Sequence, residues 1–141
     1  MTPNRKLLVV DDDMAVAQTI ARYLRYADVD VTVLTDPLKA MDLVQSEGFP
    51  LALLDIQMPG MTGIELLREI KAYDGSIKVI MMTGYATLGN LTDARQAGAD
   101  DILTKPILDM DFLSTLVDQA YDRIARWESV IGKARSFEPS V

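Results

Sequence analysis

The sequence predicts a single α/β domain built on a parallel sheet of five strands. Five short apolar runs recur along the chain, helix-length amphipathic stretches separate them, and 141 residues suit one compact domain rather than two. Apolar runs without polar alternation are typical of strands that helices cover on both faces of a parallel sheet. The runs are Leu7–Val10, Val29–Leu34, Leu51–Leu54, Val79–Met82 and the weaker Ile102–Leu103.

The first two helical stretches have clear local signals. Between the first and second runs, Val16, Ile20 and Leu24 recur at intervals of four and mark one buried helix face. After the second run, Asp36 is an N-cap residue and Pro37 occupies the first helical position, where its missing N–H costs nothing. Both stretches are therefore expected to be helices that pack on the sheet.

The third and fourth helical stretches differ in quality. Thr62 and Glu65 form a capping box that predicts the start of the third helix. The fourth helix, over about residues 88–97, contains Gly89 in its interior, which costs about 1 kcal/mol relative to Ala. Gly98 is expected to end it. We therefore predict that the fourth helix is the least stable of the set.

The fifth helical stretch is longer than the sheet requires. It runs from about Asp109 to about Ala134, which is roughly 26 residues or about 40 Å. Apolar residues continue beyond Tyr121 in alternating steps of four and three, as in a coiled-coil seam. Two interpretations stay open: one long helix whose far end frays, or a helix that dimerises or connects domains. The seam consists of Leu113, Val117, Ala120, Ile124, Trp127, Ile131 and Ala134.

Composition excludes several classes of function. The chain has no Cys and no His, which rules out disulfides, thiolate or imidazole metal sites, and Ser-His or Cys-His catalysis. Its net charge of −7 has the wrong sign for direct binding of nucleic acid or an anionic membrane. No apolar run is long enough for a signal peptide or a membrane span. The expectation is a cytoplasmic domain without a direct nucleic-acid or membrane partner.

Polar residues follow four of the five predicted strands. In an open parallel sheet, ligands bind beyond the carboxyl ends of the strands, so these residues are expected to converge. Any one of them alone is more often a loop or cap residue, but the ordered set points to a site. Its members are Asp11, Asp12 and Asp13 after the first strand, Asp55 after the third, Thr83 after the fourth and Lys105 after the fifth.

The charge balance of this set predicts a metal ion. Two carboxylates about 4 Å apart repel by about 4 kcal/mol at an effective dielectric constant of 20, and one lysine does not compensate several acids. Oxygen ligands without His or Cys suit a hard cation, and Mg²⁺ fits a site of few carboxylates, waters and a phosphate. A carboxylate beside Mg²⁺, facing a hydroxyl and an ammonium group, has the parts for phosphoryl transfer.

The residues in these motifs closely resemble the receiver domains of two-component response regulators. The resemblance covers residues from about 5 to 121, with 122–135 as a helical extension or signalling linker and 136–141 as a disordered tail. The chain is then either a free-standing regulator or the first domain of a longer protein. The motifs are Leu-Leu-Val-Val-Asp11-Asp12-Asp13, Leu-Leu-Asp55-Ile-Gln-Met-Pro59-Gly60-Met-Thr-Gly63, Met-Met-Thr83-Gly84-Tyr85-Ala86 and Ala-Gly98-Ala-Asp-Asp-Ile-Leu-Thr-Lys105-Pro106.

The resemblance implies a flavodoxin-like (βα)₅ fold with strand order 2-1-3-4-5 and a defined role for each site residue. Asp55 would be the phosphoacceptor, Asp13 only a neighbour, and the Lys105–Pro106 peptide bond cis. Thr83 would bind a phosphoryl oxygen and Lys105 would pair with it. The Mg²⁺ ligands would be Asp12 directly, Asp11 through water, Asp55 and the backbone carbonyl of Gln57.

The resemblance also implies partners and a switch. The phosphoryl donor would be a phosphohistidine on a sensor histidine kinase or a phosphotransfer protein, and the chain would catalyse only its own phosphorylation and dephosphorylation. Thr83 would move toward the phosphoryl group and switch the face of the fourth helix, fifth strand and fifth helix. A homodimer would use that face or the C-terminal helix.

Three further positions follow from the resemblance. Ile102 stands where the family usually has an aromatic switch residue. Gln57 and Tyr85 stand where side chains of the family admit or shield the water that hydrolyses the phosphoryl group. We hypothesise that Tyr85 shields the phosphoryl group and slows its loss.

Two other interpretations of the same residues stay open. A pseudo-receiver would be an interaction module that does not use phosphate, although all the acidic, hydroxyl and amine groups for it are present. A haloacid dehalogenase-like phosphatase would use Asp11 as the nucleophile, with Thr83 and Lys105 as accessory groups. In that family a further acidic pair follows the lysine, whereas the pair Asp100-Asp101 precedes it here, and Asp55 would have no role.

Overall fold

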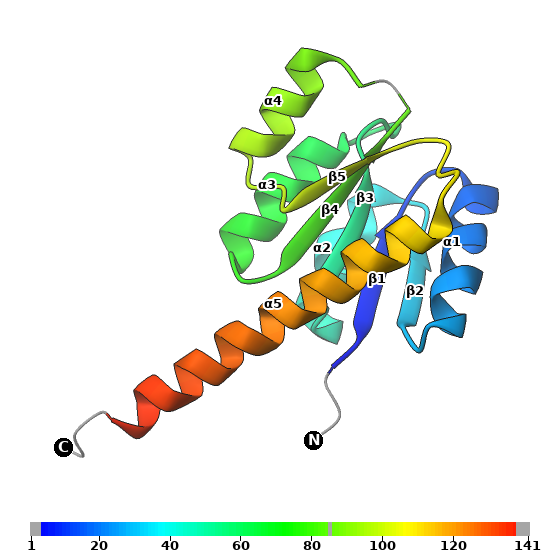
Figure 1. The fold of residues 1–141 in the computed structure, drawn as a ribbon. Helices are drawn as coiled ribbons and strands as arrows, with labels where there is room; N and C mark the ends of the chain where they lie inside the picture. Colours follow the sequence, from blue (N-terminus) through cyan, green and yellow to red (C-terminus); the bar gives the residue numbers. More distant parts are fainter. Residues whose placement is uncertain (1–3, 85, 138–141) are drawn as a thin grey trace.

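The computed structural model describes residues 4–84 and 86–137. Five parallel strands form one sheet in the order β2-β1-β3-β4-β5, which confirms the predicted fold class (Figure 1). The strands are β1 (Lys6–Val10), β2 (Asp30–Leu34), β3 (Leu51–Asp55), β4 (Lys78–Thr83) and β5 (Asp101–Thr104). The helices are α1 (Met14–Tyr26), α2 (Ala40–Glu47), α3 (Gly63–Tyr73), α4 (Leu88–Gln96) and α5 (Met110–Ser136).

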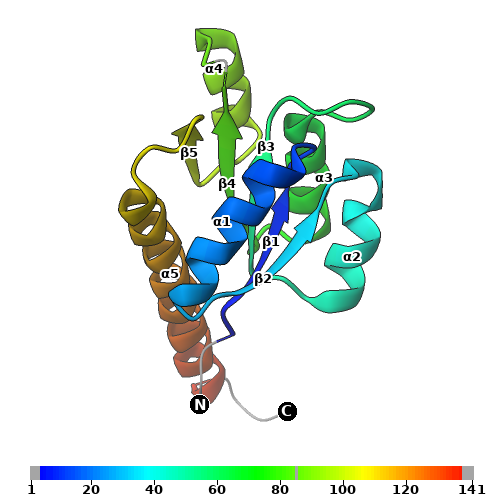
Figure 2. The same cartoon turned by 90° about the vertical axis from the view of Figure 1, so that its right-hand side faces the viewer.

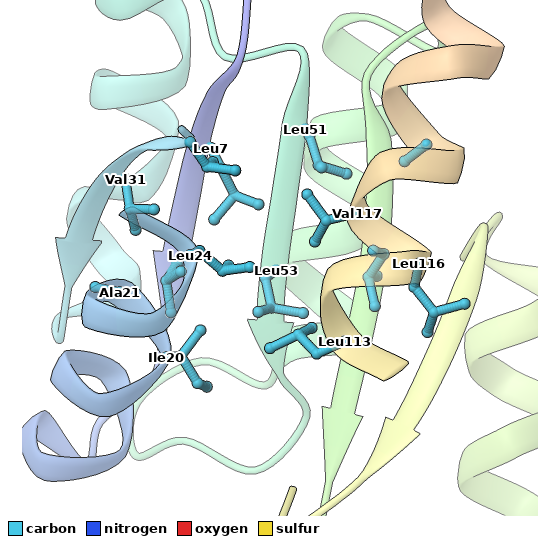
Figure 3. Packing of buried hydrophobic residues seen from close by; sticks show 14 of the residues in the cluster. Leu7, Ile20, Ala21, Leu24, Val31, Leu51, Leu53, Leu113, Leu116 and Val117 are labelled. Atoms are coloured by element: carbon cyan, nitrogen blue, oxygen red, sulfur yellow. The ribbon is translucent and has the colours of Figure 1, made fainter. Parts of the chain in front are cut away.

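Helices cover both faces of the sheet, as the uninterrupted apolar strands predict. Figure 2 shows α1 and α5 on one side of the sheet and α2 and α3 on the other. Side chains of β1 alternate between the two cores: Leu7 packs with α1 and α5, and Leu8 packs with α2 and α3. Figure 3 shows the first core, where Leu53 of β3 and Leu113 of α5 meet. The sheet is thus a rigid platform that is buried on both faces.

The helix starts follow the predicted caps, with one difference. Thr62 accepts a hydrogen bond from the Glu65 N–H, as predicted. Asp109, which was predicted only as the approximate start of the fifth helix, caps α5 by accepting from the Phe112 N–H. The second helical stretch, however, opens with a 3₁₀ turn at Pro37–Lys39 before α2. The Asp36 carboxylate caps this turn by accepting from the Leu38 N–H at 3.0 Å, and the Ala40 N–H donates to the Pro37 carbonyl, which is the i→i+3 bond of a 3₁₀ turn.

The fourth helix is weakly anchored, which agrees with its poor sequence. Ala94 is its one buried residue, and its first N–H groups are capped by Thr87, whose hydroxyl accepts from Asn90. It ends as predicted before Gly98, which has a positive φ of 99°. A left-handed residue there suits glycine. The low stability of α4 itself remains a prediction.

The fifth helix extends past the sheet as one continuous element (Figure 1). Leu113, Val117 and Ala120 are buried, whereas Trp127 and Ile131 on the same stripe are 62% and 45% exposed. The expected disordered tail began too early, because Ser136 belongs to α5 and Phe137 caps its end. The rest of that tail, residues 138–141, lies outside the described residues. None of the helices described is long and apolar enough to span a membrane.

Candidate functional site at the carboxyl edge of the sheet

The four polar strand ends converge at one edge of the sheet. Asp11 directly follows β1, Asp55 and Thr83 are the last residues of β3 and β4, and Lys105 directly follows β5. Parallel pairing of these neighbouring strands brings their carboxyl ends together. The sequence pattern therefore predicted correctly that these side chains share one edge.

The core of this edge is an ion cluster with more acid than base. The Lys105 Nζ atom lies 2.9 Å from Asp11 Oδ2 and 3.5 Å from Asp55 Oδ2. Asp11 and Thr83 are completely buried, and Asp55 is 5% exposed. A second Asp11 oxygen accepts from the Asp13 N–H at 2.9 Å. Lys105 and the Asp13 N–H thus satisfy the Asp11 carboxylate, whereas the distance from Lys105 to Asp55 is the longer of the two.

Three carboxylates at this edge lie close enough together to hold a cation. Asp11, Asp12 and Asp55 each offer an oxygen, and these oxygens all lie within 4.8 Å of one another. Asp12 is exposed, so the group opens to solvent on one side. The donor set fits Mg²⁺, a hard cation that takes few carboxylates and keeps several waters. Gln57, whose carbonyl was predicted to complete the site, follows β3 by two residues and is exposed.

The electrostatics of the edge show the strain of placing these acids together. Burial raises the pKa of Asp55 to about 6, and the charge of Asp11 adds to the rise, while Lys105 and the Gln57 N–H oppose it. For Lys105, burial lowers the pKa, but the hydrogen bond to Asp11 and the charges of Asp55 and Asp11 outweigh it and raise the pKa above its usual value. A divalent cation would relieve the excess negative charge.

One residue of the quoted motifs, Gly63, shapes this edge in a way that the sequence did not predict. Gly63, the first residue of α3, packs so closely that a Cβ atom there would lie 2.0 Å from the backbone oxygen of Asp55. Its N–H donates to the Ile56 carbonyl at 2.8 Å, and the Ile56 N–H donates to Met82 at 2.9 Å. These contacts fix the backbone that carries Asp55. A glycine immediately after the Thr62 cap was the available signal.

The remaining predicted site residues have mixed outcomes. Asp13 lies beside the carboxylates but caps α1, accepting from the N–H groups of Ala15 and Val16. The Lys105–Pro106 peptide bond is cis, as the resemblance implied. Ile102 is half-buried on β5 and packs against the core beneath α2 and α3. The hypothesis about Tyr85 lies outside the described residues.

Comparison with known protein families identifies the chain. The family model described as the response regulator receiver domain matches residues 7–118, which contain all the converging side chains. The chain belongs to the response regulator receiver family. Receiver domains of this family act in two-component signalling, and phosphorylation of an aspartate is their known role. Membership favours the receiver interpretation over the phosphatase alternative.

Curated relatives differ in how much of their length this receiver domain spans. The transcriptional regulatory protein ZraR of Klebsiella oxytoca is 39% identical over 81% of this chain, but the match covers 26% of its own length. Sporulation initiation phosphotransferase F of Bacillus subtilis is 34% identical over 73% of this chain, and the match covers 83% of it. The chain therefore spans about a quarter of the first relative and most of the second.

Solved structures agree with the fold. A CheY-like receiver domain protein from Methanospirillum hungatei JF-1 superposes with a TM-score of 0.83 at 31% identity, covering 86% of this chain and 97% of that one. The receiver domain of the Francisella response regulator 1452 has a TM-score of 0.78 at 31% identity, covering 86% and 98%. These structures support the flavodoxin-like receiver architecture from β1 to α5.

Proposed function

We propose that this receiver domain accepts a phosphoryl group on Asp55 from a phosphohistidine of a sensor histidine kinase or phosphotransfer protein. The observation that carries the proposal is the cluster of Asp11, Asp12, Asp55 and Lys105 at the carboxyl edge of the sheet. The receiver unit would comprise residues 5–121, with 122–135 as a helical extension. We place the protein in the cytoplasm, where such donors occur.

The transfer step follows from the geometry around Asp55. An Asp55 carboxylate oxygen attacks phosphorus in line, a P–O bond forms, the P–N bond to the donor imidazole breaks, and the imidazole nitrogen takes up a proton from solvent. The Asp55 pKa of about 6 leaves the carboxylate largely ionised at neutral pH. Lys105, now 3.5 Å from Asp55, is placed to pair with an oxygen of the incoming phosphoryl group.

Mg²⁺ would be held by Asp11, Asp12 and Asp55 with the Gln57 carbonyl. When bound, the cation would neutralise negative charge on the phosphoryl oxygens and on the neighbouring carboxylates. Asp11 is already fixed by Lys105 and by the Asp13 N–H, so it is oriented before the cation arrives. The exposed Asp12 leaves the cation an approach from solvent.

Thr83 is the group that would report phosphorylation to the surface. It is buried at the end of β4, and its carbonyl accepts from the Lys105 N–H at 2.8 Å. Aspartyl phosphorylation adds negative charge and acceptor oxygens, and a Thr83 hydroxyl drawn toward them would pull the segment before the weakly anchored α4. Ile102 replaces the usual aromatic, so the α4–β5–α5 face would switch without ring rotation.

Homodimerisation is the second partner interaction that we propose for this receiver, through the α4–β5–α5 face or through α5 beyond residue 121. A solved relative, the beryllofluoride-activated NtrC4 receiver domain, forms a dimer, and it shares the fold with a TM-score of 0.80 at 22% identity. The exposed apolar stripe on the far half of α5 supports the second alternative.

Phosphorylation is tested with a small phosphodonor, acetyl phosphate. The mass of the intact protein is followed over time, and the rate at which one phosphoryl group is added is measured. The parent is expected to gain the label only with Mg²⁺, and Asp55→Asn is expected not to gain it. Asp13→Asn is the matched control: it changes a neighbouring acid but keeps the α1 cap, because Asn and Asp cap equally well. Equal labelling of Asp55→Asn and the parent would refute the proposal.

The same preparation tests the pseudo-receiver alternative. If phosphorylation switches the surface, amide hydrogen exchange over α4 and β5 changes on labelling, because α4 is held by few buried contacts. A labelled protein with unchanged exchange over both elements would favour an interaction module that does not use the phosphate.

A further inference from the structure

An apolar groove of about 560 Å³ lies at the amino edge of the sheet, opposite the carboxyl edge that carries Asp55. One wall is the far half of α5, which extends past the sheet, with Trp127 and Ile131 (Figure 1). The other wall is the base of the domain, with Phe49 just after α2 and Tyr73 at the end of α3. Small-molecule sites in proteins are concave and mostly apolar, and a few polar groups in them select the ligand. The charged and aromatic groups of this groove therefore indicate what it binds.

The two walls of the groove each contribute a carboxylate. Asp74 lies on the domain wall and Glu128 on the α5 wall. Hydrogen bonds from the Ser76 hydroxyl and N–H hold the pKa of Asp74 below its usual value, so this carboxylate is ionised at neutral pH. Lys78 also lines the groove, but its ammonium group lies 3.7 Å from Asp100, which offsets its charge. The groove therefore favours a ligand of positive charge.

The ends of two helices add to this negative character. Gly48 and Asp74, which cap the carboxyl ends of α2 and α3, both line the groove. The carboxyl end of a helix carries a partial negative charge and stabilises cations. Because α2 has no basic residue in its last turn, Lys6 of β1 supplies one, and its ammonium group donates to the Glu47 carbonyl. One side of the groove thus already holds an ammonium group.

Aromatic rings give the groove a second means of binding a cation. The same Lys6 ammonium group lies 5.1 Å from the centre of the Phe49 ring, within the range of a cation–π contact. Trp127 and Tyr73 line the groove and are 62% and 50% exposed, so both rings are accessible to a ligand. Tryptophan and tyrosine are the rings that attract cations most strongly.

We propose that this groove binds a small organic cation, an ammonium group attached to an apolar body. The ammonium group lies beside the Asp74 and Glu128 carboxylates and the rings of Tyr73 and Trp127, and the apolar body packs on the exposed stripe of α5. The groove has the volume of a site for a single small molecule. It lies at the opposite edge from Asp55, so binding requires neither Mg²⁺ nor phosphorylation. A bound ligand covers this part of α5 and leaves the α4–β5–α5 face for a homodimer.

Three probes with a similar apolar body and different charge test the proposal: 4-phenylbutylammonium, 4-phenyl-1-butanol and 4-phenylbutyrate. Trp127 is the single tryptophan of the chain, so its emission reports binding in the groove. The ammonium probe is expected to bind at least about threefold more tightly than the alcohol, and the carboxylate probe most weakly. The preference for the ammonium probe should shrink as salt is raised from about 50 to 500 mM, because salt screens the two carboxylates. Equal affinity for the three probes, or unchanged emission with all of them, would overturn the proposal.

Charge substitutions show whether the two acids select the ligand. Glu128→Gln and Asp74→Asn are each expected to lower the affinity for the ammonium probe by about two- to threefold and to leave that for the alcohol unchanged. Glu69→Gln, at an exposed position of α3 outside the groove, is the matched control and should change neither. Equal losses for both probes would mean that the acids do not recognise charge, and would refute the proposal.

A ring substitution that keeps the tryptophan reporter tests the aromatic contact. Tyr73→Leu preserves an apolar side chain and is expected to weaken binding of the ammonium probe by about two- to fivefold, and that of the alcohol by less. Tyr26→Leu, at the 87% exposed end of α1, removes a tyrosine outside the groove and should have no effect. An ammonium probe that binds Tyr73→Leu as tightly as the parent would remove the aromatic part of the site and contradict the proposal.

Protein concentration separates the ligand from a second copy of the chain. The apparent dissociation constant of the ammonium probe is expected to be the same at about 1 and 100 µM protein, because no second copy competes for the groove. Weaker apparent binding at the higher concentration would assign the groove to a second copy and overturn the proposal. Asp55→Asn is expected to bind the probe like the parent, so failure of phosphorylation and failure of this site are distinguishable.

Discussion

The two edges of the sheet use the same kinds of charged residue with opposite balance. At the amino edge, Asp100 meets two lysines: Lys71 Nζ lies at 2.9 Å, Lys78 Nζ lies at 3.7 Å, and the Val79 N–H also donates at 2.8 Å. At the carboxyl edge, three acids lie together and the one lysine, Lys105, contacts two of them, Asp11 and Asp55. The first arrangement satisfies its carboxylate, whereas the second leaves an excess of negative charge that only a proton or a cation relieves.

The comparison separates groups that stabilise the fold from groups that are held ready for a reaction. Asp100 joins the end of α3, the start of β4 and the segment before β5, since Lys71 also donates to the Ile77 carbonyl at 2.6 Å. Asp55 has one longer contact, to Lys105 at 3.5 Å, and burial raises its pKa to about 6. Removing Asp100 should therefore weaken the fold, and removing Asp55 should strengthen it.

Substitution of Asp100 should have the largest effect on stability. Asp100→Asn leaves Lys71 and Lys78 without their shared counter-charge, and breaking such a largely buried pair costs about 2–4 kcal/mol. The free energy of unfolding, measured by urea denaturation at pH 7, should fall by this amount. Asp93→Asn, at an exposed position on α4, is the control and should change it by less than about 0.5 kcal/mol. A loss as small as the control's would mean that the amino edge is not stabilised by its charge balance.

Substitution of Asp55 should have the opposite sign, and the effect should depend on pH. A carboxyl whose pKa is about 6 in the folded protein and near 3.9 when unfolded stabilises the fold below that lower value. The contribution is lost as the pH rises from about 4 through 6, because the folded state keeps a proton that the unfolded chain has released. In metal-free buffer, Asp55→Asn should match the parent near pH 4 and exceed it by about 2–3 kcal/mol at pH 8.

The measurement is the difference in unfolding free energy between the two proteins across this pH range, so that titration of the other groups cancels. A difference that stays constant with pH would show that the Asp55 charge is not strained in the fold.

Addition of Mg²⁺ should give the smallest of the three effects. At a concentration tenfold above its dissociation constant, Mg²⁺ should stabilise the parent by about 1.4 kcal/mol, because it binds the folded carboxylates and not the unfolded chain. The stabilisation should be present at pH 8, above the Asp55 pKa of about 6, and should be lost in Asp12→Asn and Asp55→Asn. Equal stabilisation of the parent and both variants would place the cation elsewhere.

The sequence predicted the carboxyl edge better than the amino edge, for a physical reason. Strand ends are visible as the last polar residue after an apolar run, so Asp11, Asp55 and Lys105 were identified together. Asp100 and Lys71 meet only because α3 and the segment before β5 pack side by side, and no local pattern shows that. Gly63 was missed because its role is a close approach between backbones.

The far half of α5 is a second case in which the sequence predicted an element but not the surface that it forms. Its helical period and apolar seam were visible in the sequence, and the structure confirms one continuous helix to Ser136. The groove that the seam forms with Phe49 and Tyr73 depends on the turns at the base of the domain, which the seam does not specify. Local patterns therefore predicted the elements, and their packing determined the surfaces.

The most direct test of the central claim is to locate the phosphoryl group chemically. The parent is treated with acetyl phosphate and Mg²⁺, and borohydride then reduces the acyl phosphate to the alcohol, which marks the modified aspartate as homoserine in a peptide mass map. The account predicts homoserine at position 55 and at neither 11 nor 12, and none when Mg²⁺ is withheld. Homoserine at position 11, or no homoserine at all, would contradict it.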